Sequence, residues 1–329
     1  METRKILFVG DLNEYGRGLQ RCNGLKDLGC AVTGLSQVPL GWNPRNRNLF
    51  HSIFWRLKIP IDSTGVNKKI KEEVSKNKFG VVWIEKGNTI YPCTLKFIKK
   101  HSPETKLISV SEDDMYAPHN YSLYYRMGLK YYDIVFTTKV YNLLELKSFG
   151  AKRTELFLDS YGEKTHHPYE LTTEEKARFS SGVGFAGSFE GDRAERMLYL
   201  AEHGIKITVW GLDWGPWVGK HPNLDIKNEQ LPVVDYSKSI CATKINLCFL
   251  RKINRDEVTS RSVEIPACGG FMLGERTKRH SEFFKEGKEA EFFAGNEEML
   301  AKVEYYLGHE SDRERIAAAG MERCQRDYS

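Results

Sequence analysis

One stretch in the last third of the chain combines residues that could bind a sugar and a phosphate. Two acids, Asp256 and Glu264, enclose three hydroxyl side chains and Arg261. If a helix begins near Thr259, its first backbone N–H groups attract an anion, and the arginine offers a donor fork suited to phosphate. The carboxylates could accept hydrogen bonds from vicinal hydroxyls of two sugar rings. A solvated helix start, with Glu257 paired to Arg261 at i,i+4 spacing, is the alternative, and the residues alone leave both open.

A second candidate phosphate site follows a predicted buried strand. Gly187 and Ser188 open a polar turn, and Arg193 lies at the start of the predicted helix. Glycine between a strand and a helix start is the form of a phosphate cradle, although neither a Walker A loop nor a dinucleotide fingerprint is present. Arg193 is therefore a candidate diphosphate ligand, and a tight turn with a surface arginine is the alternative.

The first half of the chain offers weaker candidates. Asp113 and Asp114 precede His119 in a loop after a predicted strand. Paired acids suggest acid–base or metal chemistry, but no third ligand is nearby, so we expect no metal. His119 could hydrogen-bond a reacting sugar or phosphate, or be structural. The turn at 16–18, with Gly16, could bring backbone close to a ligand, or be a plain turn.

Three further segments have structural explanations. Residues 42–58 are aromatic and basic; they could meet an anionic acceptor, a nucleic acid or a partner, or form a rim helix with snorkelling basic side chains. The tryptophans between residues 210 and 217 could stack a base, although packing is the favoured role. His166 and His167 lie in a predicted linker and are expected to be solvated.

Strands that alternate with helices must position these residues. Predicted strands cover 5–10, 31–35, 80–85, 106–110, 133–136 and 156–158 in the first half, and 182–187, 205–211, 244–250 and 270–273 in the second. This alternation predicts two doubly wound parallel sheets, which bind ligands beyond the carboxyl ends of their strands. Apolar periodicity lapses over 159–172, and we place the domains at 1–165 and 166–329.

The bulk composition excludes several classes of protein. The 329 residues carry a net charge of +5, which is far from the footprint of a dedicated nucleic-acid binder. Seven cysteines without C-x-x-C spacing argue against a zinc site or a disulfide framework. No signal peptide or membrane-length apolar run occurs. A cytoplasmic location is therefore expected.

Two α/β halves with this ending resemble the GT-B glycosyltransferases, whose two Rossmann-like domains face a cleft. The C-terminal half is similar to the CgeB/YkvP spore-protein glycosyltransferase-like group within the family 4 (group 1) enzymes. The similar segments are Gly184-Phe185-Ala186-Gly187-Ser188, Val209-Trp210-Gly211, Lys244-Ile245-Asn246-Leu247, Asn254-Arg255-Asp256, 261–271, 287–293 and 315–320. Relatives usually continue into a last helix where this sequence ends at Asp327-Tyr328-Ser329, which suggests a shortened C-terminus.

The resemblance implies a retaining, metal-independent transfer of a hexose from a nucleotide-diphosphate sugar held mainly by the second domain. It places Glu264 on the donor ribose, Asp256 near the transferred sugar as a variant of the E-x7-E pattern, and Arg193 on the diphosphate. The candidate catalytic residues are His119, Asp114 and Asp256. The candidate donor-binding residues are Gly16, Ser188, Arg193, Arg251, Asp256, Arg261, Glu264 and Gly269.

The implied partners are the nucleotide sugar as co-substrate and an acceptor that is a glycan, a protein or a small molecule. The first-domain loops and residues 42–58 would receive the acceptor, with peripheral membrane contact as a further option. No cofactor, metal or nucleic acid is expected. A non-catalytic sugar- or nucleotide-binding protein of a surface or spore assembly, and a sugar-nucleotide epimerase, are the alternatives. The nucleotide base, the sugar, the acceptor and the oligomeric state stay open.

Overall fold

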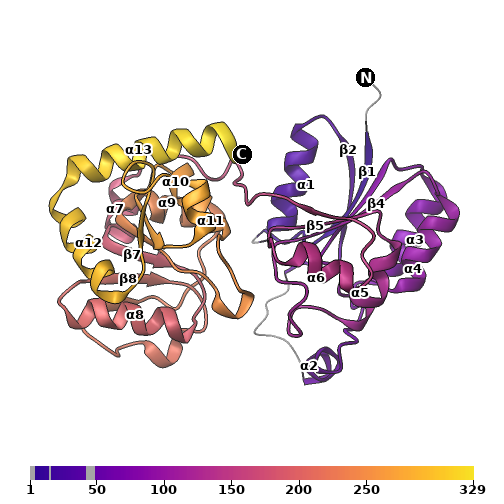
Figure 1. Cartoon of the computed structure of the whole chain (residues 1–329), viewed down its shortest axis with the longest axis horizontal. Coiled ribbons are helices and arrows are strands. Elements are labelled where there is room, and N and C mark those ends of the chain that lie inside the picture. Colours follow the sequence, from indigo (N-terminus) through magenta and orange to yellow (C-terminus); the bar gives the residue numbers. More distant parts are fainter. Residues whose placement is uncertain (1–3, 15, 42–48) are drawn as a thin grey trace. The chain divides into compact units, whose positions relative to one another are not determined.

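The computed structural model describes residues 4–14, 16–41 and 49–329. The chain divides into two compact units, Met1–Leu158 and Asp159–Ser329, and each is built on a six-stranded parallel sheet with flanking helices (Figure 1). This confirms the predicted α/β fold with two Rossmann-like units. The part of the basic, aromatic segment with Trp42, Arg45 and Arg47 lies outside the described residues.

The first sheet has the strand order β2-β1-β3-β4-β5-β6. Its strands are β1 (Lys5–Gly10), β2 (Ala31–Ser36), β3 (Val81–Glu85), β4 (Lys106–Ser111), β5 (Ile134–Thr137) and β6 (Thr154–Leu156). Its helices are α1 (Arg17–Asp27), α2 (Leu49–Arg56), α3 (Val66–Lys76), α4 (Pro92–His101), α5 (Leu123–Gly128) and α6 (Asn142–Ser148). Central strands are continuous apolar blocks such as Leu7 to Val9, because helices cover a parallel sheet on both faces. The strand order reverses between β1 and β3.

The second sheet has the order β12-β11-β10-β7-β8-β9. Its strands are β7 (Ser181–Ala186), β8 (Ile207–Trp210), β9 (Leu224–Ile226), β10 (Thr243–Cys248), β11 (Met272–Glu275) and β12 (Glu291–Phe293). Its helices are α7 (Thr173–Phe179), α8 (Gly191–Glu202), α9 (Val233–Ala242), α10 (Ser260–Ala267), α11 (Lys278–Phe283), α12 (Asn296–Gly308) and α13 (Glu310–Asp327). The order reverses between β7 and β10, and such a reversal is where doubly wound sheets bind their ligands.

Three elements of the second unit were not predicted. β9 and β12 are each three residues long, too short to show a period. Helix α7 begins with a capping box in which Thr172 and Glu175 exchange hydrogen bonds. The segment 159–172 contains no helix or strand and belongs to the second unit, where Tyr161 and His166 are buried.

Within the described parts of the chain, no helix is long and apolar enough to cross a membrane. Over the same residues, no group of three or more His, Cys, Asp and Glu side chains could hold a metal ion.

Candidate functional site

The loops that follow β7 and β10 lie on either side of the reversal in the second sheet. Three hydrogen bonds fix the loop after β7 against the loop after β8. The N–H of Gly187 donates to the Trp210 carbonyl (2.8 Å), the N–H of Phe189 to the Leu212 carbonyl (2.9 Å), and the indole N–H of Trp214 to the Gly187 carbonyl (2.9 Å). Trp210 and Trp214 are buried and Trp217 is half-buried against the core, which agrees with the packing role favoured from the sequence. The loop is therefore held rigidly at the start of α8.

Only glycine fits at position 211 in this arrangement. Its φ is +142°, and a Cβ there would stand 2.0 Å from the Gly187 carbonyl oxygen. The close approach of the two loops depends on this missing side chain.

Two arginines lie close to the ring of Phe185 at this end of the sheet. The guanidinium carbon of Arg193, in the first turn of α8, lies 5.3 Å from the ring centroid, and that of Arg261, in α10, lies 5.4 Å from it. The Arg193 side chain is buried, with 3% of its surface exposed. The structure therefore brings together the two arginines that the sequence placed in separate candidate sites.

Part of the donor capacity of this pair is unused. Nη1 of Arg193 donates to the Ser188 carbonyl (3.1 Å), and Nη2 lies 3.2 Å from Oε2 of Glu190 without the alignment of a hydrogen bond. Arg261 donates from Nη2 to the Phe249 carbonyl (3.0 Å). Within the described structure, Nε and Nη2 of Arg193 and Nε of Arg261 are buried and make no hydrogen bond. Buried donors of this kind are suited to an oxyanion.

Electrostatics favour the same ligand. Burial, followed by the positive charge of Arg261, lowers the pKa of Arg193 to about 10. Burial of the protonated Arg193 guanidinium therefore costs folding free energy, and an anion bound close to both guanidinium groups would offset that cost.

Glu264 is buried one turn inside α10, where two polar side chains surround its carboxylate. The Tyr236 hydroxyl donates to Oε2 of Glu264 (3.0 Å), and Nε2 of His166 lies 3.7 Å from Oε1. Burial and the nearby charge of Glu264 raise the pKa of Tyr236, so the phenol keeps its proton and acts as a donor. His166 has 2% of its surface exposed. The expectation that His166 is solvated is therefore wrong, because the segment that carries it packs against α9 and α10.

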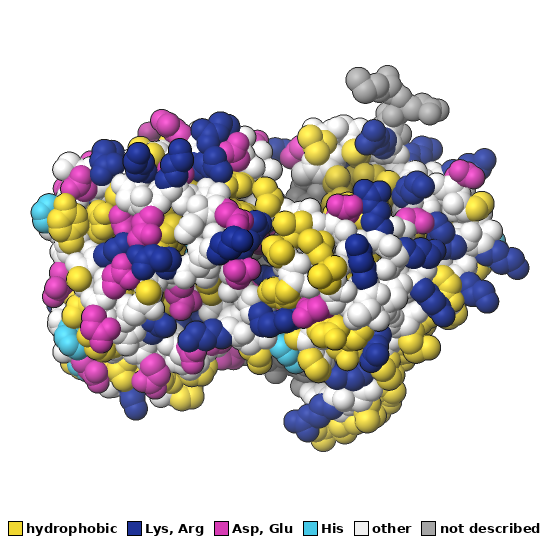
Figure 2. Space-filling view, in the orientation of Figure 1, with side chains coloured by type: hydrophobic (Ala, Val, Ile, Leu, Met, Phe, Trp, Pro, Cys, Tyr) yellow, Lys and Arg dark blue, Asp and Glu magenta, His cyan; other side chains and the backbone are white. Residues whose placement is uncertain are grey.

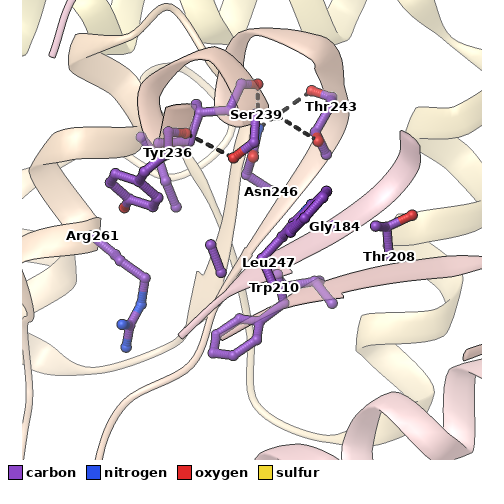
Figure 3. A pocket seen from close by; sticks show the side chains of 13 residues that line it. Gly184, Thr208, Trp210, Tyr236, Ser239, Thr243, Asn246, Leu247 and Arg261 are labelled. Carbon is purple, nitrogen blue, oxygen red and sulfur yellow. Dashed lines mark hydrogen bonds between the residues drawn. The ribbon is translucent and has the colours of Figure 1, made fainter. Parts of the chain in front are cut away.

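A small recess lies beside these residues, between β7, β8 and β10 on one side and α9 and α10 on the other. Figure 3 shows Tyr236 and Arg261 on one side of it, with Thr208 and Thr243 on the opposite side. Its volume is about 10 Å³, roughly what one water molecule requires. With the side chains as they stand, the recess cannot hold a nucleotide base.

The start of α10 is fixed by a buried hydrogen-bond chain. Thr259 is the N-cap, as predicted, and its N–H donates to Oγ of Ser262 (3.2 Å). Nδ1 of His280 lies 2.6 Å from the Glu275 carbonyl, so this nitrogen carries the proton, and the Ser262 hydroxyl donates to Nε2 (2.7 Å). Burial lowers the pKa of His280 to about 4, which keeps the ring neutral. This chain orients the turn that presents Arg261.

Asp256 and Arg251 form a closed loop after β10. Oδ1 of Asp256 accepts from Nδ2 of Asn254 (2.7 Å), and the Asp256 N–H donates to the Arg251 carbonyl (3.1 Å). Nε of Arg251 donates to Oε1 of Glu190 (2.5 Å), which ties this loop to the turn after β7. Asp256 thus shapes the loop beside the arginine pair.

The remaining predicted donor residues of this unit lie differently. Ser188 is exposed and contributes its backbone carbonyl to Arg193. Gly269 follows α10 in a left-handed turn with φ of +73°, facing Pro168 and Met321. Helix α10 is about 12 Å long, on a rise of about 1.5 Å per residue, and Gly269 lies beyond its C-terminus while Arg261 lies in its first turn. The structure does not bring Gly269 to the arginine pair.

In the first unit, the loop after β4 carries His119 and Asp114. His119 is exposed, whereas Asp114 has none of its surface exposed. Oδ1 of Asp114 accepts from the N–H groups of Tyr116 and Ala117 (3.2 Å each) and from Nδ2 of Asn142 (2.8 Å). The carboxylate of Asp114 is enclosed by its own loop and positions that loop, and the catalytic role expected for it stays a prediction.

Gly16 is the N-cap of α1 and is buried against the turn after β1. A Cβ at this position would stand 2.8 Å from the Asp11 carbonyl oxygen. The glycine is needed for this close packing.

The carboxyl edge of the first sheet also carries a charge cluster that sequence reasoning missed. Nη1 of Arg21 donates to Oε2 of Glu85 (2.6 Å), Nη2 of Arg21 pairs with Glu112, and Nη2 of Arg17 lies 3.2 Å from Oε1 of Glu112. Although burial opposes it, the positive charges of Arg17 and Arg21 hold the pKa of Glu112 at about 2. The i,i+4 spacing of the two arginines was the available signal, because it puts both on one face of α1.

Comparison with known proteins agrees with this architecture. Residues 193–329 match the model of the family described as glycosyl transferase-like. The matched part is similar to that family and makes up less than half of the 329-residue chain. It contains both arginines and Glu264. No curated protein sequence matches the chain.

Solved structures match over nearly the whole chain. Sucrose-phosphate synthase from Thermosynechococcus elongatus has a TM-score of 0.68 at 11% identity, and the match covers 99% of this chain and 95% of that one. HepE of Anabaena, in complex with UDP and glucose, has a TM-score of 0.62 at 10% identity, with 99% and 96% covered. A Rickettsia africae glycosyltransferase has a TM-score of 0.60 at 11% identity, with 100% and 95% covered. These likenesses confirm the GT-B fold, and the glycosyl transferase-like domain supports the predicted type of enzyme.

Proposed function

We propose that this protein is a glycosyltransferase that moves a hexose from a nucleotide-diphosphate sugar to an acceptor, with retention of configuration and without a metal ion. We further infer that it belongs near the CgeB/YkvP group, on the segments of the second unit that resemble it. The observation that carries the proposal is the pair of buried Arg193 and half-buried Arg261, with buried donor atoms that make no hydrogen bond at the reversal of the second sheet.

The diphosphate would bind between the two guanidinium groups. Leaving-group departure places negative charge on the phosphate oxygen as its bond to the anomeric carbon breaks. Fixed donors that face this charge stabilise the transition state more than the ground state. Arg193 is held by Ser188 and Arg261 by Phe249, so neither guanidinium would need to reorganise when the charge develops.

Glu264 would accept hydrogen bonds from the donor ribose. Tyr236 and His166 hold its carboxylate in place, and a carboxylate that is already oriented loses little freedom on binding a diol. The nucleotide would lie across the mouth of the adjoining recess, because the recess itself admits only about one water molecule. Asp256 would approach the transferred sugar, and Arg251 would assist the diphosphate.

The first unit would supply the acceptor side of the reaction. His119 is exposed on the loop after β4, where it could hydrogen-bond the transferred sugar, and the charge cluster of Arg17 and Arg21 stands at the same edge of the sheet. The acceptor would be a glycan, a protein or a small molecule.

A thermal-shift panel of UDP-, GDP-, ADP-, CDP- and dTDP-sugars tests the donor site. A ligand that binds the native state raises its stability in proportion to the logarithm of its concentration over Kd. One nucleotide class should raise the Tm, Glu264→Ala should abolish the shift, and Glu304→Ala, an exposed glutamate on α12, should preserve it. If Glu264→Ala left affinity and turnover unchanged, the donor assignment would be wrong.

A product assay separates transfer from the two alternatives. Slow release of free sugar from the donor supports a transferase, and release that continues in the presence of a chelator supports independence from metals. One matching structure, a protein assigned as a UDP-N-acetylglucosamine 2-epimerase from Listeria monocytogenes, has a TM-score of 0.57 at 12% identity. Conversion of the donor sugar without any acceptor would favour an epimerase. Binding without turnover would favour a non-catalytic binding protein.

A further inference from the structure

Helix α2 has an apolar face that the described structure leaves uncovered. None of its eight residues is buried. Leu49, Phe50 and Ile53 are 77%, 59% and 44% exposed, and Leu57, just after the helix, is 57% exposed. Their spacing puts them along one side of the helix. A helix on the surface of a soluble domain normally turns such a stripe toward the core.

The apolar surface continues onto α5. The N–H of Leu123 donates to the Lys58 carbonyl (2.7 Å), and Nζ of Lys58 bonds the Pro118 carbonyl, so the end of α2 is held against the start of α5. Leu123 and Met127 are 41% and 59% exposed. We call the exposed side chains of α2, Leu57, α5 and Lys130, which lies in the turn after α5, the α2–α5 surface.

Basic residues are interleaved with these apolar ones. Leu123, Arg126, Met127 and Lys130 follow i, i+3, i+4, i+7 spacing, and all four are exposed. No Asp or Glu occurs in 49–61 or in 115–132, whereas the 44 acids of the 329-residue chain would put about four in segments of this combined length. Figure 2 shows hydrophobic side chains gathered over the lobe that α2 forms in Figure 1, with Lys and Arg side chains beside them. The surface is both apolar and positively charged.

We propose that the α2–α5 surface docks on a lipid bilayer that contains anionic lipids. Exposed Phe, Leu, Ile and Met side chains can insert at the boundary between headgroups and acyl chains, while Arg and Lys contact the anionic headgroups. The absence of acids from both segments is the charge pattern that a negative surface requires. The inference goes beyond the donor chemistry and is independent of it, since the donor site lies in the second unit and can be assayed without lipid.

Co-sedimentation of the full chain with vesicles tests the proposal. The vesicles contain phosphatidylcholine alone or mixed with an equal part of phosphatidylglycerol. We expect binding to the mixed vesicles, weaker binding to the neutral ones, and a loss of at least about tenfold in partitioning at high salt, because surface charge is screened within a few ångströms there. Absence of binding to mixed vesicles, or equal binding to both kinds at all salt concentrations, would overturn it.

Matched variants locate the contact. The double substitution Phe50→Glu and Ile53→Glu should reduce vesicle binding at least about tenfold, whereas Leu144→Glu, at a residue of α6 that is 75% exposed, should leave it unchanged. Arg126→Glu with Lys130→Glu should also reduce binding, whereas Lys96→Glu with Lys100→Glu, exposed on α4, should do so much less. Circular dichroism and the donor thermal shift confirm that each variant is folded.

A protein partner is the competing occupant of the surface. If the wild-type chain sediments as a dimer that Phe50→Glu dissociates, and neither protein binds mixed vesicles, the surface is a protein interface and the membrane proposal fails. Equal loss of vesicle binding in the Leu144→Glu control would overturn it as well.

Discussion

Replacing Arg193 by methionine should stabilise the ligand-free protein while weakening nucleotide binding. At neutral pH this arginine is protonated in both the folded and the unfolded chain, so the folded state carries the full cost of burying the charge beside Arg261. Lowering its pKa to about 10 corresponds to about 3 kcal/mol at 1.36 kcal/mol per pKa unit. The variant loses the hydrogen bond to Ser188 and the contact over Phe185, about 2 kcal/mol together. A net gain of about 1 kcal/mol in unfolding free energy follows.

In the presence of nucleotide, the wild type should instead be more stable than Arg193→Met. Saturation with UDP, or with the nucleotide that the panel identifies, at about 100 times Kd adds about 2.7 kcal/mol to the stability of the wild type. Arg193→Met lacks half of the proposed diphosphate clamp, and we expect its affinity to fall about 100-fold. Glu190 keeps Arg251 as a partner in the variant, so the substitution does not leave an unpaired carboxylate behind.

Urea unfolding with and without nucleotide measures both effects. Arg315→Met is the control, because that side chain is 58% exposed and forms a surface ion pair with Asp312 (3.3 Å). Its unfolding free energies without and with nucleotide should each stay within about 0.5 kcal/mol of wild type. The assignment of an anion site at Arg193 would be refuted if ligand-free Arg193→Met were less stable than wild type and nucleotide raised its unfolding free energy as much as that of wild type.

Three further predictions concern the same unit. His280 is neutral in the folded protein because burial lowers its pKa to about 4. Between about pH 6.5 and 4 the unfolded chain therefore binds one more proton than the folded protein, and up to about 3 kcal/mol of stability should be lost as the pH falls through this range. In His280→Gln this part of the pH dependence, measured by urea unfolding, should vanish, and an unchanged slope would contradict the prediction. Gly211→Ala should cost more than about 2 kcal/mol in chemical denaturation, whereas Gly219→Ala, at φ of +76° in open space, should cost about 1 kcal/mol; equal losses would show that the loop contact does not matter. Tyr236→Phe removes the hydroxyl that donates to Glu264. It should weaken nucleotide binding about tenfold, measured by calorimetry, and change the unfolding free energy by less than about 1.5 kcal/mol. Unchanged affinity would show that Tyr236 and Glu264 do not belong to the donor site.

The fold could be read from the sequence to the extent that its elements are periodic. Apolar blocks that end in glycine, as at Lys5–Gly10 and 182–187, predicted central parallel strands that the structure confirms. The edge strands β9 and β12 escaped because three residues cannot display a period. Helix α7 escaped although Thr172 and Glu175 form a capping box, since its apolar residues are few.

The candidate site was predictable only in part. Arg193 and Arg261 could be named because a helix start after a strand is recognisable in one dimension. The role of Phe185, their shared neighbour, could not be predicted, because α8 and α10 each place one arginine beside it only in the folded chain. His166 was placed in solvent for the same reason: nothing in its neighbourhood along the chain indicates that it lies beside Glu264.

Glu190 connects these observations. One of its oxygens pairs with Arg251 at 2.5 Å and the other lies 3.2 Å from Arg193, so a single carboxylate joins the loops after β7 and β10. Its negative charge and that of Glu275 do not cancel the burial and the positive charge of Arg261 that lower the pKa of Arg193, so the ligand-free site has room for a further anion. A diphosphate would bring the missing charge and meet donors already fixed by Ser188 and Phe249. In the proposed function, the charge imbalance that costs the ligand-free protein stability would also favour a doubly charged ligand at the reversal of the sheet.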